Sequence, residues 1–225
     1  MKSVLLYIAD DEGFEARFQA ALDLTRSLGG HLHCLRANPY NSQMAFDGVT
    51  GISVMYDISQ MSRELDEKLR AEIERRLADE DVSWDYQEVN ADPARGLSKN
   101  SALVDIIVLS SASQDKDNAL PLGILGDVLF NATAPVIVQP DDVKKFDACG
   151  TALVAWNGSL EAGNALRAAV PLLKMASDVH ILTVTTFRSS PHPNILPIMV
   201  SSPKFTAPRR VKFRWMSRCS QKRKM

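Results

Sequence analysis

Apolar and polar positions follow one another along the first part of the chain in blocks, and their period alternates between that of a buried strand and that of a helix. Residues 4–9 form a continuous apolar run, which is typical of a parallel strand covered on both faces. An amphipathic helical stretch follows as far as Leu28, and Gly29-Gly30 predicts its end because glycine accepts a left-handed cap. Residues 31–36 are expected to form the next strand.

The same alternation continues to residue 138. Residues 37–57 have no clear period and are expected to form a long connection. Apolar residues spaced by four predict a helix over residues 58–78, at Met61, Leu65, Leu69, Ile73 and Leu77. Strands are predicted at 84–89, 104–109 and 136–138, with helices at 94–102 and 124–131. This order predicts an α/β fold with a doubly wound parallel sheet of five strands.

The opening pattern returns in the second half of the chain. Residues 152–156 are an apolar run that ends in the turn Asn157-Gly158-Ser159, and an amphipathic stretch and a second apolar run come after it. Such a long period indicates two copies of a domain, the second a partial β-α-β copy. The predicted organisation is a domain at residues 1–140, a linker at 141–150, a partial second module at 151–186 and a tail at 187–225.

Composition excludes several classes of protein. No apolar run approaches the roughly 18 residues of a membrane span, and no basic segment followed by an apolar one opens the chain, so a cytoplasmic protein without membrane contact is expected. The three cysteines, Cys34, Cys149 and Cys219, are widely spaced. They indicate neither a disulfide framework nor a zinc site and are interpreted as small buried hydrophobes.

Charge divides the chain at residue 187. All 27 acidic residues precede it, whereas ten of the 26 basic residues follow it. The prolines and the missing periodicity of the tail predict a disordered extension, whose composition is that expected of translation in a shifted frame. A nucleic-acid-binding arm is the alternative, because unopposed positive charge attracts phosphate. Nucleic acid is the less favoured partner.

Several segments together resemble the universal stress protein family over about residues 2–186. They are the strand, turn and helix that open each copy, the turn at residues 90–93, the run at 104–109, and Val128-Leu129 followed by Pro135-Val136-Ile137-Val138. The turn at 157–159 nearly reproduces the family's Asp-Gly-Ser, with Asn157 in place of the aspartate. The resemblance implies a Rossmann-like or flavodoxin-like fold used in the stress response. It also implies pairing through the last strand, Val136–Val138, as a homodimer or an internal pseudo-dimer.

Some members of that family bind ATP through a Gly-x2-Gly-x9-Gly-Ser/Thr loop after the fourth strand. Here residues 110–118 contain no glycine, and Asp115 and Asp117 would repel phosphate, so the phosphate cradle is predicted to be absent and ATP is disfavoured as a cofactor. Gly123 or Gly126 could stand in for the last glycine of the loop.

The remaining candidates for a nucleotide site are polar. Asp10 occupies the position where nucleotide-binding members place an acidic residue, and it is interpreted either as a helix cap or as a ligand contact, with the cap favoured. Ser110, Ser111 and Ser113 could hydrogen-bond a ligand or accept a phosphoryl group, or they form a solvated loop.

Other catalytic chemistry has little support. His31 and His33 share one side of a predicted strand at a spacing that could bind a metal, but no third ligand is apparent and a structural pair is favoured, so no metal is expected. No hydrolase triad is recognisable. The sequence therefore predicts a non-catalytic stress-response protein that acts through dimerisation and partner contacts. An ATP-binding switch with slow hydrolysis and a nucleic-acid-binding protein are the alternatives.

Overall fold

The computed structural model describes residues 1–38, 52–111, 120–143 and 145–183, without the side chains of residues 52–62. Several predictions concern residues outside the described ones: Ser113, Asp115 and Asp117 in the loop where the phosphate cradle is predicted to be absent, and the tail at 187–225. The chain divides into two units, Met1–Asp147 (unit 1) and Ala148–Met225 (unit 2). The boundary falls within the predicted linker.

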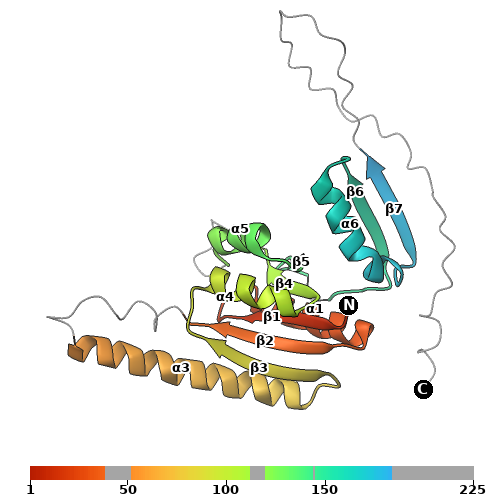
Figure 1. The fold of residues 1–225 in the computed structure, drawn as a ribbon. Coiled ribbons are helices and arrows are strands. Elements are labelled where there is room, and N and C mark those ends of the chain that lie inside the picture. The colour runs from red at the N-terminus through yellow and green to blue at the C-terminus, as the bar shows by residue number, and fades with distance from the viewer. Residues whose placement is uncertain (39–51, 112–119, 144, 184–225) are drawn as a thin grey trace, which may run out of the picture. The chain divides into compact units, whose positions relative to one another are not determined.

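Unit 1 is built around one parallel sheet of five strands in the order β3-β2-β1-β4-β5 (Figure 1). The strands are β1 (Ser3–Ile8), β2 (His31–Ala37), β3 (Ser83–Val89), β4 (Ile106–Ser110) and β5 (Val136–Gln139). The helices are α1 (Phe14–Leu28), α3 (Ile52–Ala78), α4 (Pro93–Asn100), the short 3-10 helix η1 (Ser101–Leu103) and α5 (Leu122–Asn131). The predicted doubly wound α/β fold is confirmed.

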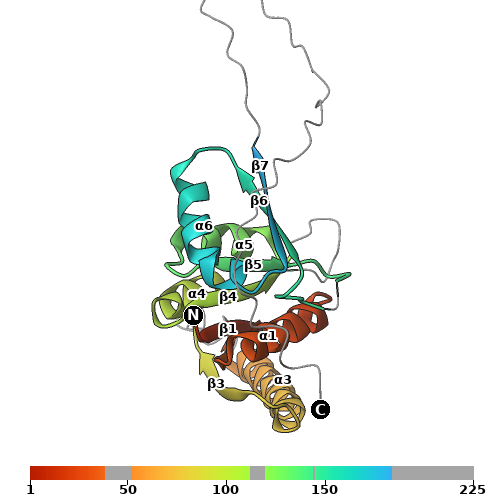
Figure 2. The same ribbon diagram turned by 90° about the vertical axis from the view of Figure 1, so that its right-hand side faces the viewer.

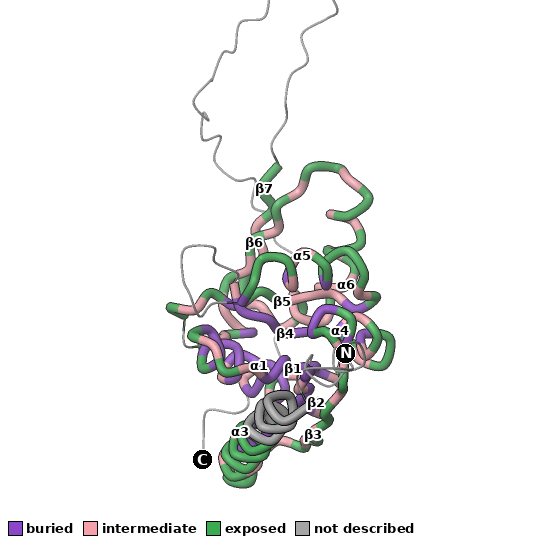
Figure 3. The backbone as a smooth tube through the Cα atoms, turned by 90° about the vertical axis from the view of Figure 1, so that its left-hand side faces the viewer, coloured by how far each residue is buried: buried purple, intermediate pink, exposed green. Residues whose placement is uncertain are grey.

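Burial follows the position of each strand in the sheet. The central strands β1 and β4 are almost wholly buried, because helices cover both of their faces, and Figure 3 shows buried positions gathering there and in α1. The edge strand β3 alternates instead between half-buried and exposed residues.

Helices cover the two faces of the sheet in pairs (Figure 2). On one face, α4 and α5 contribute Leu97, Leu125 and Val128 to a core with alternate strand residues, among them Leu5, Tyr7, Leu35, Ile107 and Leu109. On the other face α1 packs against β1 and β4. Helix α3 joins that layer, since its Arg76 lies over the ring of Phe18 at 4.2 Å.

Most element boundaries lie within two residues of the predicted ones, and two differences have structural consequences. Helix α3 begins at Ile52, so residues 52–57 are helical rather than part of the long connection. Strand β4 begins at Ile106, because the carboxylate of Asp105 accepts hydrogen bonds from the backbone N–H groups of Lys2 (2.6 Å) and Ser3 (3.0 Å) at the amino end of β1. The predicted helix end holds: Gly29 has a φ of 56° and caps α1.

The described part of unit 2 is a β-α-β segment. Its elements are β6 (Thr151–Trp156), α6 (Leu160–Leu173) and β7 (Asp178–Thr183), and the two strands are parallel and in register from Thr151 and Asp178. Every described residue of α6 stays at least partly exposed. Across the described ranges of both units, no helix combines the length and the apolarity that crossing a membrane requires.

Candidate functional site

The carboxyl ends of β1 and β4 are the first place to look for a ligand. In an open α/β sheet, ligands bind where the strand order reverses and the following helices go to opposite faces. Here β1 leads to α1 on one face and β4 leads to α5 on the other. Two of the predicted residues, Asp10 and Ser110, come at or just after these strand ends.

A buried arginine fills this position. Arg17 of α1 is 0% exposed and donates through Nε to the carbonyl oxygen of Tyr7 (2.8 Å) and through Nη2 to that of Ala9 (3.1 Å). Its Nη1 donates to the Asp11 carboxylate (2.5 Å) and to the Ser110 hydroxyl (2.6 Å). We call Arg17, Asp11 and Ser110 the Arg17 cluster. The cluster ties β1 to β4 with donors that solvent does not reach.

A second arginine holds the same end of β1. Arg36 of β2 donates to the Ile8 carbonyl oxygen (3.3 Å) and pairs with Asp66 of α3 at 3.0 Å. The side-chain amide of Asn38 also donates to Asp66. Three successive carbonyl groups at the end of β1, those of Tyr7, Ile8 and Ala9, therefore accept hydrogen bonds from arginine side chains.

Close packing completes the closure. A Cβ at Gly13 would lie 2.5 Å from Ser110 Cβ and 2.6 Å from the Asp141 carboxylate, so a glycine is required by the lack of space. Ser111 donates its hydroxyl to Asp141 (3.2 Å) and its backbone N–H to Gln139 (2.9 Å). Ser110 and Ser111 thus hydrogen-bond to the protein itself. Within the described residues, the turn after β1 therefore packs directly against the end of β4.

The favoured interpretation of Asp10 as a helix cap is wrong. Helix α1 begins at Phe14, its N-cap is Gly13, and no side chain caps it. Asp10 is exposed, whereas its neighbour Asp11 forms the ion pair with Arg17. Arg17 was not among the residues predicted from the sequence, although one signal marks it: the arginine lies in the apolar stripe of α1.

The two glycines proposed to replace a phosphate loop lie in α5. A Cβ at Gly123 or at Gly126 would meet no described atom within 4 Å. Neither glycine therefore serves a close approach within the described part of the chain.

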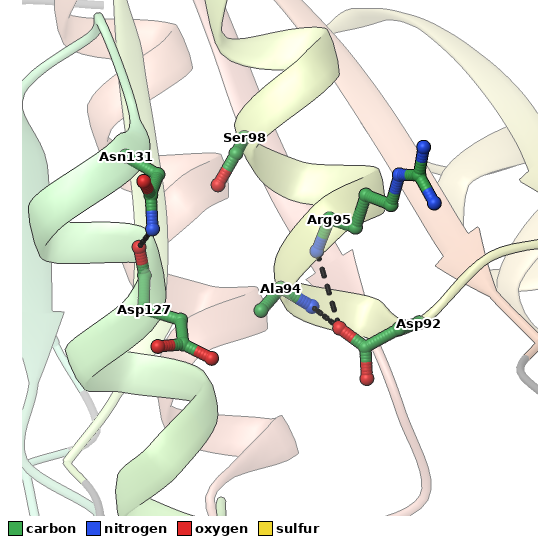
Figure 4. A pocket seen from close by; sticks show the side chains of 6 residues that line it. All are labelled: Asp92, Ala94, Arg95, Ser98, Asp127 and Asn131. Atoms are coloured by element: carbon green, nitrogen blue, oxygen red, sulfur yellow. Dashed lines mark hydrogen bonds between the residues drawn. The ribbon is translucent and has the colours of Figure 1, made fainter.

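A cavity of about 310 Å³ lies between α4 and α5. The carboxylate of Asp92 caps α4 by accepting from the backbone N–H groups of Ala94 (3.0 Å) and Arg95 (3.2 Å). Figure 4 shows the Asp127 carboxylate beside this space and the Arg95 guanidinium pointing away from α5. Among the described residues that line this cavity, no cation faces the two carboxylates, which disfavours phosphate binding there.

Unit 2 has a cavity of about 440 Å³ lined mainly by apolar groups, among them Ala155, Trp156, Ala162 and Leu182. The turn beside it satisfies its own backbone: Asn157 accepts from the N–H of Ser159 (3.0 Å), and Ser159 caps α6 by accepting from the N–H of Ala162 (3.1 Å). The polar side chains of the turn therefore act as local caps.

Two further predictions concern thiol and imidazole chemistry. Cys34 is 1% exposed, as predicted, and burial raises the pKa of its thiol to about 12, which keeps it protonated and unreactive at neutral pH. The prediction is wrong for Cys149, which is partly exposed and disulfide-bonded. His31 and His33 do have a third ligating group beside them, contrary to expectation. It is Asp85 of β3, and we call these three residues the histidine cluster.

Comparisons with known proteins identify the fold. No protein-family model and no curated protein matches the sequence. Among solved structures, the universal stress protein UspA from Lactobacillus plantarum matches with a TM-score of 0.52 and 13% identity, over 61% of this chain and 97% of that chain. A universal stress protein from Archaeoglobus fulgidus DSM 4304 matches with a TM-score of 0.60 and 19% identity, over 82% of this chain and 68% of that chain.

The second match reaches beyond unit 1, because unit 1 ends at Asp147 of 225 residues and the match covers 82% of the chain. The first match, at 61%, is no longer than unit 1. The chain therefore has the fold of the universal stress proteins, as its sequence predicted.

Proposed function

We propose that this chain is a stress-response protein of the universal stress type, which acts without catalysis and through contacts with a second copy of itself. The observation that carries the proposal is the closed end of β1 and β4. Arg17 donates to Tyr7, Ala9, Asp11 and Ser110, so among the described residues a buried guanidinium, and not a glycine-rich backbone, lies where β1 and β4 end. A triphosphate at these strand ends would meet donors most of which already have partners within the protein.

The free edge of the sheet supports contact between copies. Strand β5 is the last of the order β3-β2-β1-β4-β5, and no further described strand lies beside it. Val138 on this strand is 39% exposed, and the adjoining helix α5 exposes Leu129 and Phe130. An unpaired strand edge with apolar neighbours favours pairing with another strand edge.

The hydrogen-bond pattern of β5 shows which groups are available for such pairing. The carbonyls of Pro135 and Gln139 accept from Ile107 and Ser111 of the β4 segment. Because successive residues of a strand direct their backbone groups to opposite sides, the N–H of Val138 points away from β4. This N–H is the natural donor to a second copy.

Titration of the full-length chain with MgATP in a calorimeter tests the absence of a nucleotide site. We expect no binding tighter than about 100 μM. Tighter binding would support the ATP-switch alternative, and hydrogen exchange in the presence of ATP would then show which unit holds the nucleotide. Protection of the β1 and β4 ends would refute the closed-end argument directly.

Light scattering coupled to gel filtration tests the edge contact. We expect a mass of about twice 24.8 kDa for the unmodified chain and a monomer for Val138→Pro, which removes the outward N–H without touching the β4 ladder. Leu65→Lys is the matched control, because it changes an exposed apolar residue of α3, far from β5 in the sheet order. A monomeric unmodified chain, or a dimer that survives Val138→Pro, contradicts the proposal.

A further inference from the structure

We propose that the histidine cluster, His31, His33 and Asp85, binds a divalent transition-metal ion, with zinc the favoured ion. The three residues share one face of the sheet at the amino ends of β2 and β3. His31 and His33 are alternate residues of β2, and the parallel register places Asp85 directly opposite His33. The topology thus brings Asp85 beside two histidines that precede it by more than fifty residues in sequence.

The three ligand atoms already converge. Asp85 Oδ1 lies 3.0 Å from His31 Nε2 and 2.6 Å from His33 Nδ1, and all three lie within 4.8 Å of one another. A tetrahedral zinc ion with bonds of about 2.0 Å holds its ligand atoms about 3.3 Å apart. The two oxygen–nitrogen distances therefore need to lengthen by less than about 1 Å, and the distance between the two nitrogen atoms, at most 4.8 Å, needs to shorten by no more than about 1.5 Å.

A hydrogen bond outside the three ligands orients one of the rings. His31 Nδ1 lies 2.6 Å from the hydroxyl of Ser83, the residue directly opposite it on β3. If Nδ1 donates to Ser83, then Nε2 carries the free lone pair toward Asp85. Metal-binding histidines are regularly fixed in this way through their second nitrogen.

The donor set and its exposure define the kind of ion. Two imidazoles and one carboxylate suit zinc and neighbouring transition metals, whereas calcium and magnesium prefer oxygen ligands. The side chains of His31, His33 and Asp85 are 36%, 34% and 52% exposed, so an ion can enter from solvent and keep water in its fourth position. Three protein ligands with one open position form an exchangeable site rather than a closed structural one.

Calorimetric titration of the EDTA-treated, full-length chain with zinc chloride tests this site. We expect one ion per chain with a dissociation constant below about 10 μM. His33→Ala and Asp85→Asn should each weaken binding at least about tenfold, and Ser83→Ala should weaken it by about tenfold through the freed His31 ring. Visible absorption of bound Co²⁺ provides a second readout, since tetrahedral coordination gives a strong band.

His180→Ala is the matched control, because it removes a histidine of β7 in the other unit and should leave the affinity unchanged. Circular dichroism of each variant confirms that it folds. The proposal is overturned if the unmodified chain binds no zinc at about 100 μM. It is equally overturned if zinc binds with the same affinity to both His33→Ala and Asp85→Asn.

Discussion

The Arg17 cluster and the histidine cluster lie at opposite ends of one parallel sheet, and they differ in how far the protein satisfies their polar atoms. Arg17 is fully buried and makes four hydrogen bonds to strand ends and to the turn between them. In the histidine cluster, two partly exposed imidazoles share a single oxygen of Asp85. One cluster is closed by protein atoms and the other is open to solvent.

The difference follows from burial. A charge that is removed from water is tolerated only where the protein supplies its partners, and protein atoms accept from four of the five N–H donors of Arg17. In a partly exposed cluster the desolvation cost is smaller, and a side chain can replace a hydrogen-bond partner by a metal ion or by water. We therefore expect substitutions in the Arg17 cluster to act on stability, and substitutions in the histidine cluster to act mainly on metal affinity.

Arg17→Ala is expected to have the largest effect. It leaves the Asp11 carboxylate, which is 9% exposed, and the buried Ser110 hydroxyl without their shared partner. Loss of one member of a buried ion pair costs about 3–5 kcal/mol of unfolding free energy. Urea unfolding followed by circular dichroism measures the change.

Arg75→Ala is the control for this substitution, because Arg75 is an exposed arginine of α3 whose ion pair with Glu72 lies on the surface. Its unfolding midpoint should match that of the unmodified chain. If Arg17→Ala shifted the midpoint no further than Arg75→Ala, the end of β1 and β4 would not be closed as described.

A pair of glycine substitutions tests the close packing at the ends of β1 and β4 by adding a methyl group rather than by removing a charge. Gly13→Ala would place a Cβ against Ser110 and Asp141, and overpacking of this kind costs about 1–3 kcal/mol. Gly126→Ala adds a Cβ where no described atom lies within 4 Å, inside a helix, and should stabilise the chain by about 0.5–1 kcal/mol. Thermal unfolding of both variants shows whether each substitution raises or lowers the melting temperature. If both changes had the same sign, the close packing described at Gly13 would be contradicted.

The sequence predicted the sheet well because each strand carries its own local signal. The apolar run at residues 4–9 and the glycine pair after Leu28 define β1 and the end of α1 without reference to the rest of the chain. Local signals do not determine burial: β6 repeats the pattern of β1, yet every second residue of β6 is exposed. Burial depends on neighbouring strands and helices, which the local pattern does not contain.

The two clusters escaped sequence reasoning for the same physical reason. Asp11 and Arg17 lie close in sequence, but Ser110 joins them only because β4 pairs with β1. Asp85 joins His31 and His33 only through the register of β2 and β3. The register between two strands depends on the tertiary structure and cannot be read from either strand alone. Without Asp85, the two histidines were therefore predicted to be a structural pair.

His33→Ala tests whether the histidine cluster, unlike the Arg17 cluster, contributes little to the stability of the fold. Because His33 is partly exposed, its removal in the presence of EDTA should change the unfolding free energy by less than about 1 kcal/mol. Urea unfolding under the conditions used for Arg17→Ala makes the two values directly comparable. A loss as large as that of Arg17→Ala would mean that the histidine cluster is a structural element of the sheet rather than an open site.

The smallest expected effect depends on pH and concerns Asp105, at the same end of the sheet as the histidine cluster. Hydrogen bonds from the backbone N–H groups of Lys2 and Ser3 lower the pKa of Asp105 below its ordinary value of 3.8. The charged carboxylate therefore stabilises the fold fully at pH values above the ordinary pKa of 3.8. This contribution is lost as the pH falls through the lowered pKa of the folded state. Because the side chain is about half exposed, Asp105→Asn should cost less than about 1 kcal/mol at pH 7. Urea midpoints of the two proteins should converge between pH 5 and about pH 2, whereas a gap that stays constant or widens toward acid would show that this carboxylate does not anchor β1.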